Sequence, residues 1–266
     1  MSAFTSPPVI IAIQNAPDVP LNLVGKWLAE AGFDLRGIHA YAHQPLPTTV
    51  ESLQDLIGGQ RLVAIIPLGG SIGALDDESA PWLVAERALL TDAIAHDLPV
   101  LGLCLGAQLL AASVGGEVSR APKPEIGVHK ISITDAEDPI FGSLSKSHDV
   151  PAIQWHQDMV TELPSSATTI ASSTLCQNQI FRIGRLHYGL QFHPEADPTI
   201  IKMWERKADE AYLRSEQRVG IADEVATEME TLESIWKPAI KRWGAMVLAW
   251  HSSKGATPPK PPAPLR

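Results

Sequence analysis

The stretch from Pro99 to Ser113, PVLGLCLGAQLLAAS, constrains the fold more than any other part of this 266-residue chain. Val100–Leu103 is a short apolar run, typical of a strand that is buried on both faces of a parallel sheet. From Ala107 onward the residues are good helix formers, so we expect Cys104 where a strand turns sharply into a helix. The glycines two residues before and two residues after Cys104 permit such a crowded turn.

This GxCxG pattern is the cysteine counterpart of the GxSxG nucleophile elbow. In that geometry the Cys104 sulfur stands at the carboxyl edge of the sheet, beside free N–H groups at a helix N-terminus. Such N–H groups stabilise a thiolate and can also hold an oxyanion. The alternative is a small buried cysteine that fills a strand end, as free cysteines often do. The pattern favours the nucleophile.

The run LHYGLQFHPE, far downstream, supplies a base for this thiol. Tyr188–Phe192 predicts another buried strand with His193 at its end, and Pro194 disfavours the helical conformation for His193. Glu195 lies near enough in the chain to orient the imidazole ring. A Cys, a His and a carboxylate at two strand ends form an acyl-transfer triad. A histidine without a chemical role is the usual alternative, but Cys104 and Glu195 together favour a base.

The two runs GLCLGAQLLA and QFHPE together resemble the class I, or triad-type, glutamine amidotransferases, the Cys-His-Glu enzymes that release ammonia from glutamine. The resemblance extends over Val9 to Glu195. It implies an α/β fold of three-layer α/β/α, flavodoxin-like type with a mostly parallel sheet. Antiparallel strands are expected before His193, and C-terminal helices are expected on the edge of the sheet.

The resemblance also implies an oxyanion hole. A glycine pair follows the predicted strand Leu62–Leu68, and the carboxyl ends of such strands are where ligands bind in open α/β sheets. In the family this pair supplies one oxyanion amide, which corresponds by position to Gly70, and Leu105 supplies the other. A simple loop turn is the alternative interpretation of the glycine pair.

Three further residues are predicted to bind substrate. Gln108 lies four residues after Cys104, on the same side of the helix, and the family uses the Gln at this place to contact the amino-acid end of the substrate. The family's His-x-Asp motif, which helps to bind the α-amino and carboxylate groups of glutamine, corresponds to His156 and Asp158. A purely structural role is the alternative for both. Cys176 lies in a polar loop without elbow geometry and is interpreted as a bystander.

We predict three parts of the chain: a catalytic domain at 1–196, a helical extension at 197–253 and a disordered Pro-rich tail at 254–266. Glu117–Gly127 holds two prolines, and only from Val128 does the pattern predict an antiparallel strand. In the extension, a stripe at helical spacing includes Trp236, Trp243 and Trp250, and Pro238 is expected to kink or split its helix. The stripe packs either on the catalytic domain or at an interface such as that of a homodimer.

Composition excludes several classes of partner. A net charge of −9 and the lack of a basic cluster argue against nucleic acid, and no apolar run is long enough to span a membrane. A reactive Cys104 requires a reducing compartment, so we expect a cytoplasmic protein. Neither a metal nor an organic cofactor is implied.

The predicted function is hydrolysis of the γ-amide of glutamine through a γ-glutamyl thioester on Cys104, with ammonia passed to a separate acceptor or synthetase. No ATP-binding glycine loop occurs in the chain, so a fused synthetase domain is not expected. A free-standing γ-glutamyl hydrolase or peptidase, acting on a γ-glutamyl amide or peptide, is the alternative. A non-catalytic regulatory module is disfavoured by the intact Cys104, His193 and Glu195. The sequence leaves the acceptor of the ammonia open.

Overall fold

The first strand of the computed structural model, β1 (Val9–Gln14), is buried along its whole length. The structure describes residues 6–147, 149–208 and 220–254. Alternate side chains of a strand point to opposite faces, and here Ile10 and Ala12 enter one apolar core while Val9, Ile11 and Ile13 enter another. A strand that is apolar on both faces needs helices on both sides of its sheet.

The described strands form one sheet of nine, in the order β2-β1-β3-β4-β9-β8-β7-β5-β6. Their bounds are β2 (Asp34–His39), β3 (Leu62–Pro67), β4 (Val100–Leu103), β5 (Glu117–Ile133), β6 (Val150–Glu162), β7 (Ala167–Ser172), β8 (Ile180–Ile183) and β9 (His187–Leu190). Strands β2, β1, β3, β4 and β9 pair in parallel, and the remaining pairs are antiparallel. Because β9 is parallel to β4, the two strands end at the same edge of the sheet.

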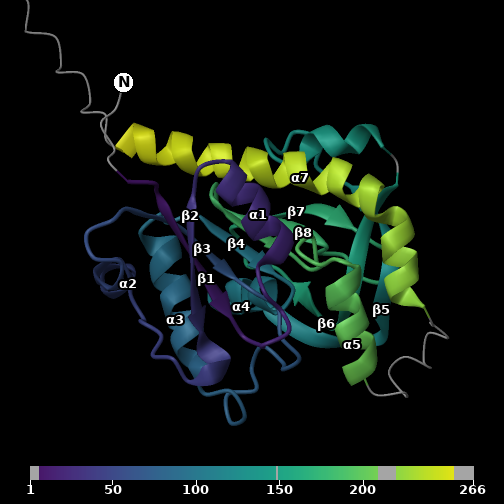
Figure 1. Ribbon diagram of the computed structural model, residues 1–266, viewed down its shortest axis with the longest axis horizontal. Coiled ribbons are helices and arrows are strands. Elements are labelled where there is room, and N and C mark those ends of the chain that lie inside the picture. The colour runs from purple at the N-terminus through teal and green to yellow at the C-terminus, as the bar shows by residue number, and fades with distance from the viewer. Residues whose placement is uncertain (1–5, 148, 209–219, 255–266) are drawn as a thin grey trace, which may run out of the picture.

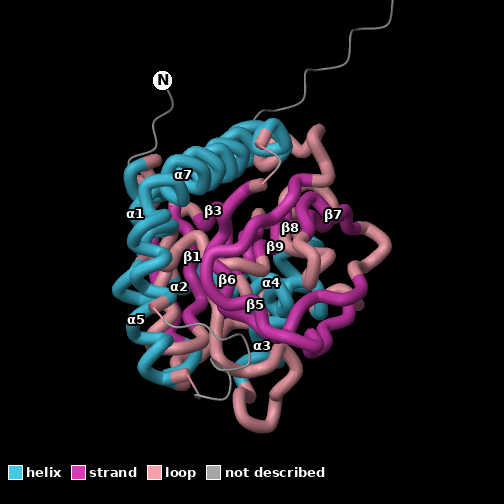
Figure 2. Tube along the Cα trace, turned by 90° about the vertical axis from the view of Figure 1, so that its right-hand side faces the viewer, coloured by secondary structure: helices cyan, strands magenta, loops and turns pink. Residues whose placement is uncertain are grey.

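Helices cover both faces of the sheet. One core contains side chains of α1 (Asn22–Glu30), α5 (Pro198–Lys207) and α7 (Ile221–Lys254), and the other those of α2 (Val50–Leu56), α3 (Trp82–Ala95) and α4 (Leu105–Ala112). Two short 3₁₀ helices, η1 (Ala40–Ala42) and η2 (Gly142–Lys146), complete the described elements. Figures 1 and 2 show α1, α5 and α7 gathered on one side of the strands. The predicted three-layer α/β/α fold is confirmed.

Strand β5 begins earlier than the sequence pattern predicts. It pairs antiparallel with β6 from Glu117 onward, and the register shifts between Arg120 and Glu125. Pro122 and Pro124 lie within that shift. A proline has no N–H for the ladder and is tolerated in strands mainly at edges and irregularities. The prolines therefore interrupt the pairing locally without ending the strand.

Helix α7 runs through Pro238 without being split. Figure 1 shows that the helix bends along its length, as expected where a proline removes one helical hydrogen bond. The helix packs on β5 and β6 and extends across to β3 and α1. It therefore covers a face of the sheet, whereas we expected the C-terminal helices on its edge.

The three tryptophans of α7 differ in burial. Trp236 and Trp243 are fully buried in the core beside α1, and Trp236 Nε1 donates to the carbonyl of Pro151 at 2.9 Å. The Trp250 ring is half-buried, donates from Nε1 to the Asp97 carbonyl and lies 5.9 Å below the guanidinium of Arg185. The proposed boundary at residue 196 stays a prediction, and residues 255–266 of the predicted tail lie outside the described residues.

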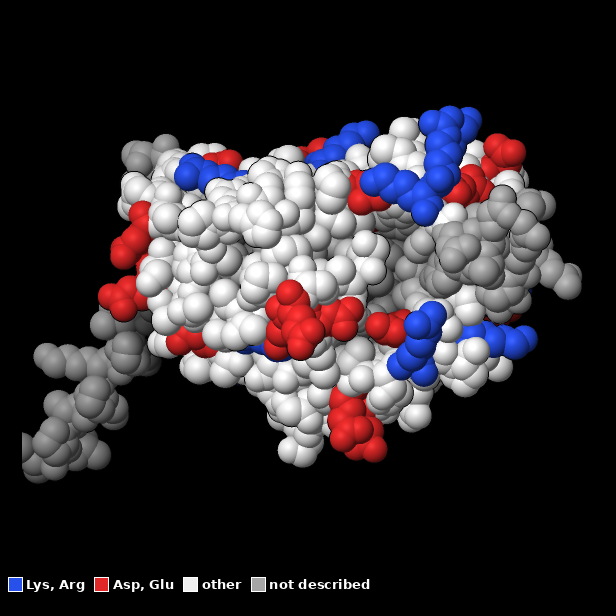
Figure 3. All heavy atoms as spheres, turned by 90° about the horizontal axis from the view of Figure 1, so that it is seen from below, with Lys and Arg blue, Asp and Glu red and all other residues white. Residues whose placement is uncertain are grey.

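Charged side chains are dispersed over the face of the molecule that is seen from below (Figure 3). Viewed from below, Asp and Glu side chains form several small groups, Lys and Arg others, and most of the surface between them is uncharged (Figure 3). Within the described ranges, no helix combines the length and the apolar character needed to cross a bilayer.

Replacing Trp243 with Ala should lower the free energy of unfolding by about 3–5 kcal/mol, because it empties a fully buried site. Trp250→Ala is the matched control and should cost much less, because its ring is half-buried. Denaturant unfolding with light scattering measures both stability and mass. A Trp243→Ala protein of wild-type stability and half the wild-type mass would instead place this stripe at a subunit interface.

Candidate active site

Cys104 occupies the turn between β4 and α4 in a conformation that is strained for a residue with a side chain. Its φ is 51° and its ψ is −109°, far from the ordinary regions of the backbone map. A Cβ on Gly102 would lie 2.5 Å from the carbonyl oxygen of Gly106, and one on Gly106 would overlap the backbone of Pro67. Neither glycine has a positive φ. These glycines therefore permit the close packing of backbones around the elbow, as predicted for a crowded turn.

His193 and Glu195 follow β9, the strand that pairs with β4. The N–H of Cys104 donates to the carbonyl of Leu190 at 2.8 Å, which holds the elbow beside the end of β9. His193 Nδ1 lies 2.7 Å from Glu195 Oε1, and both side chains are almost completely buried. The Trp204 ring from α5 packs edge-on against the imidazole at 4.7 Å between centroids. The carboxylate accepts a hydrogen bond from Nδ1–H, which leaves Nε2 available for the thiol.

Cys104 and Glu195 determine the charge of His193. Burial opposes a charged ring, but the Cys104 sulfur and then the Glu195 carboxylate outweigh it and raise the pKa of His193 to about 10. At neutral pH the imidazole is therefore protonated. A protonated imidazole beside a nucleophilic sulfur can act as a general acid. It donates a proton to the leaving group of the substrate that the sulfur attacks.

The glycine pair passes directly beside these groups. A Cβ on Gly69 would lie 3.1 Å from Cε1 of His193 and 3.6 Å from the Cβ of Cys104. A Cβ on Gly70 would lie 2.9 Å from a methyl carbon of Leu105, the first residue of α4. The first N–H groups of a helix have no intrahelical acceptor. The structure thus brings Gly70 and Leu105 together next to the elbow.

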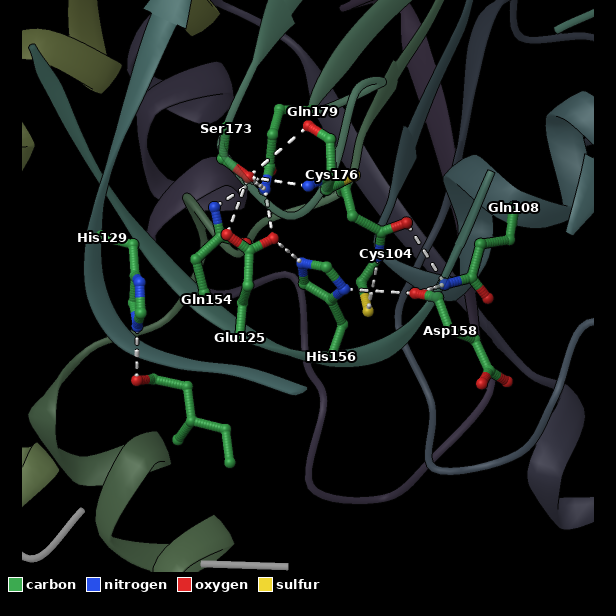
Figure 4. A network of polar contacts seen from close by, with 12 residues as sticks. Cys104, Gln108, Glu125, His129, Gln154, His156, Asp158, Ser173, Cys176 and Gln179 are labelled. Atoms are coloured by element: carbon green, nitrogen blue, oxygen red, sulfur yellow. Dashed lines mark hydrogen bonds and ion pairs between the residues drawn. The ribbon is translucent and has the colours of Figure 1, made fainter. Parts of the chain in front are cut away.

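A chain of amide side chains leads from the sulfur to Asp158. Gln191 Nε2 lies 3.7 Å from the Cys104 sulfur, and its Oε1 accepts from Gln108 Nε2 at 3.3 Å. Gln108 Nε2 also donates to the main-chain carbonyl of Asp158 at 2.8 Å. Figure 4 shows the Asp158 carboxylate turned away from this network. The main chain of Asp158 is therefore held by Gln108, while its carboxylate points out of this network (Figure 4).

His156 lies in the same network but is almost completely buried. Its Nδ1 is 3.1 Å from the Asp158 carbonyl, and its Nε2 is 3.3 Å from Glu125 Oε2. Ser173 and Gln179 donate to the same carboxylate at 2.7 and 2.8 Å (Figure 4). Burial works against the Glu125 charge, but the bonds from His156 and Ser173 hold the pKa of Glu125 below its ordinary value. His156 thus contacts Asp158 and Glu125 inside the protein.

Sequence reasoning missed several polar residues of this region. Gln191 stands within the quoted QFHPE run, and Glu125 within the irregular segment before Val128, but nothing local in the sequence links them to Cys104 or His156. Their signal is a polar residue inside an apolar or strand-forming run. The structure places Cys176 in a different environment, where burial raises the pKa of its thiol to about 12.

Comparison with known proteins decides the family. The family model described as "Glutamine amidotransferase class-I" matches residues 66–205. This stretch contains Cys104, His193 and Glu195. The chain belongs to the class I glutamine amidotransferase family. This confirms the resemblance seen in the sequence.

The curated relatives differ in their activities. The glutamine amidotransferase-like protein YfeJ of Salmonella typhimurium is 31% identical over 64% of this chain and 68% of its own length. A glutamine-hydrolysing GMP synthase subunit of Natronomonas pharaonis is 40% identical over 51% of this chain and 80% of its own length. Gamma-glutamyl peptidase 3 of Arabidopsis thaliana is 32% identical over 54% of this chain, which spans only 59% of that relative.

Solved structures share the fold over most of the chain. A glutamine amidotransferase from Methylobacillus flagellatus is 26% identical, with a TM-score of 0.74 over 90% of this chain and 94% of that one. One from Thermotoga maritima, 24% identical, has a TM-score of 0.74 over 89% of this chain and 98% of that one. Among the described residues, no group of three or more His, Cys, Asp or Glu side chains is arranged to hold a metal ion.

A substrate-mimicking chloroketone should alkylate Cys104 and spare Cys176. Cys104 lies beside a protonated imidazole, whereas burial raises the pKa of the Cys176 thiol to about 12 and so suppresses its thiolate. Mass spectrometry of peptides from the labelled protein identifies the modified cysteine. Cys104→Ala is the control, and label on Cys176 in the wild-type protein would contradict the assignment of the nucleophile.

Proposed function

We propose that this protein hydrolyses the γ-amide of glutamine through a γ-glutamyl thioester on Cys104. The observation that carries the proposal is the strained Cys104 elbow beside a buried His193–Glu195 pair 2.7 Å apart. Family membership supports it, since relatives such as the GMP synthases are named as glutamine-hydrolysing.

The reaction follows from the charges at the site. The Cys104 sulfur attacks the γ-carbonyl carbon, and the C–N bond breaks as His193 donates its Nε2 proton to the departing amine. Ammonia leaves, and the acyl group remains on the sulfur as a thioester. Water then attacks the thioester carbonyl while His193 takes up a proton, which releases glutamate and restores the thiolate. Glu195 holds the tautomer and orientation of the ring throughout.

The N–H groups of Gly70 and Leu105 would hold the oxyanion. The two residues are in contact beside the elbow, and Leu105 begins α4, so its N–H points out of the helix end. Preformed N–H donors aimed at a developing negative charge commonly contribute about 10²–10³-fold to the rate. No side chain at Gly69 or Gly70 stands between these groups and the sulfur.

Asp158 would bind the α-amino group of the substrate. Its carboxylate is turned away from the buried network (Figure 4), and an ammonium group is its natural partner. Gln108 and His156 both bind the Asp158 main-chain carbonyl. We therefore place them behind Asp158 as residues that position it, whereas the family resemblance implies that they contact the substrate directly.

The ammonia would pass to a separate synthetase chain. Several GMP synthase relatives support such a partner, because their names describe one subunit of a synthase. The elbow requires a reduced thiol, which supports a cytoplasmic location. Residues 1–196 would form the catalytic domain and 197–253 its helical extension.

A γ-glutamyl peptidase is the second candidate, favoured by the 32% identity to gamma-glutamyl peptidase 3. The same thioester chemistry would serve, with an amino acid or peptide amine in place of ammonia as the leaving group. The two activities differ only in the leaving group that the site accepts.

A turnover panel separates the two candidates. The purified protein is assayed for ammonia from glutamine and for free amine from γ-glutamyl peptides and amides. Cys104→Ala should lose about 10⁴-fold or more of any such activity, because it removes the nucleophile. Faster release of ammonia from glutamine supports the glutaminase, and faster cleavage of the peptides supports the alternative. Activity that survives in Cys104→Ala would contradict both.

Two matched carboxylate-to-amide substitutions separate binding from chemistry. Asp158→Asn should raise KM about tenfold or more with a smaller change in kcat, because it removes the charge that binds the substrate ammonium. Glu195→Gln should lower kcat with little change in KM, because it disturbs the tautomer of His193. Steady-state kinetics on the preferred substrate measures both. A kcat loss confined to Asp158→Asn would reverse the two roles.

A further inference from the structure

Glu86 on α3 is a fully buried carboxyl group that the proposed reaction does not use. Its Oε1 accepts a hydrogen bond from Asn15 Nδ2 at 3.2 Å. Its Oε2 is buried with no hydrogen-bond partner in the described part of the chain. Most buried polar groups in folded proteins have partners, so this arrangement calls for a physical reason.

Asn15, directly after β1, connects Glu86 to the glycine pair. Its Nδ2 also donates to the main-chain carbonyl of Leu68 at 3.1 Å, and its Oδ1 accepts from Trp82 Nε1 at 2.9 Å. Leu68 is joined to Gly69 by the next peptide bond. A Cβ on Gly70 would lie 3.3 Å from the Asn15 Cβ. Asn15 thus holds, by a hydrogen bond, the Leu68–Gly69 peptide at the start of the glycine loop beside Cys104.

Glu86 makes this contact without a charge at neutral pH. Burial raises the pKa of Glu86 to about 8, against smaller opposing effects of the Asn15 bond and the Arg87 charge. Arg87 is the charged group that acts on this carboxyl, and its own guanidinium is bound to the Ala74 carbonyl and the Asp77 carboxylate. With Oε1 accepting from Asn15, the acid proton resides on Oε2.

We propose that the neutral carboxyl group of Glu86 and the amide of Asn15 form a clamp that positions the Gly69-Gly70 loop beside Cys104. Both are positioning residues, because neither touches the reacting atoms. The inference rests on the proposed function, in which the Gly70 N–H holds the oxyanion. A displacement of about 1 Å in such a donor can lower a rate by about 10²-fold.

The clamp has a consequence for pH. Loss of the Glu86 proton leaves an anion in the core with one amide donor and a second oxygen without a partner, which is costly. The loop then loses its support as the pH rises through about 8. Because Glu86 binds its proton more tightly when folded, stability due to this group is complete below its ordinary pKa and declines as the pH rises toward the raised value.

The test uses Glu86→Gln, which resembles the protonated acid in shape and stays neutral at every pH. The full chain is assayed on its preferred substrate between pH 6 and 9.5, with thermal unfolding at each pH. Asn15→Ala removes the amide, and Glu230→Gln, at an exposed position of α7, is the matched control. This pH range lies on both sides of the raised pKa of Glu86.

The clamp predicts that the wild type loses kcat above about pH 8 and that Glu86→Gln keeps it, with KM unchanged in both. The Tm of Glu86→Gln relative to wild type should rise with pH, and Glu230→Gln should follow the wild type throughout. Asn15→Ala should lose about 10–100-fold in kcat, more than in KM.

Two results would overturn the inference alone: superimposable pH profiles for wild type and Glu86→Gln, or wild-type kcat in Asn15→Ala. If Asn15→Ala does not fold, the Glu86→Gln profile decides. A wild-type protein that releases amine from no substrate of the panel would overturn the proposed function, and the inference with it.

Discussion

The close approach of β3, β4 and α4 around Cys104 is the constraint on which the site depends. Glycine at positions 102 and 106 lets three backbones approach so closely that a single Cβ would collide with a carbonyl group or a neighbouring peptide. The strain of Cys104 at φ 51° is sustained by this packing. In return the sulfur stands at the start of α4, where the backbone N–H groups point outward. Relaxation of the elbow would move the sulfur, the Leu105 N–H and the glycine pair together.

Three buried carboxyl groups, Glu195, Glu125 and Glu86, lie in different polar environments. Glu195 faces the protonated ring of His193 at 2.7 Å in the interior. Glu125 accepts bonds from Ser173 and Gln179 and faces His156, which keeps its pKa low. Glu86 has a single amide donor, and burial raises its pKa to about 8. Burial raises the pKa of both Glu125 and Glu86, and the hydrogen bonds around each decide whether the pKa ends below its ordinary value, as for Glu125, or above it, as for Glu86.

These groups come from distant parts of the chain because the parallel half of the sheet gathers strand ends. Parallel strands end at the same edge of a sheet. The residues that follow four of these strand ends are Asn15 after β1, Gly69 after β3, Cys104 after β4 and Gln191 after β9. The antiparallel half adds Glu125 and His156, which are direct partners in the β5–β6 register. Helices α5 and α7 cover the face of the sheet opposite to α4, and α5 places Trp204 against His193. Burial of the site is thus a product of both halves of the sheet.

Sequence alone determined the local features of this protein, and tertiary structure alone decided what they contact. An apolar run between glycines, followed by helix formers, predicts the elbow at Cys104, and apolar strands buried on both faces predict helices on both sides of a sheet. Such features are set by interactions within about ten residues, which the order of residues expresses directly. The contacts of Glu125 with His156, of Gln191 with the Cys104 sulfur and of Glu86 with Asn15 join residues 31 to 87 positions apart, and no spacing in the sequence encodes them. The course of α7 across β3 and α1 likewise depends on which face of the sheet was left uncovered. Burial, and with it the neutral state of Glu86, exists only once the layers have packed, because a charge becomes costly only when water is removed from it. The protonation of His193 depends on the same packing for another reason, since packing brings Cys104 and Glu195 to its ring.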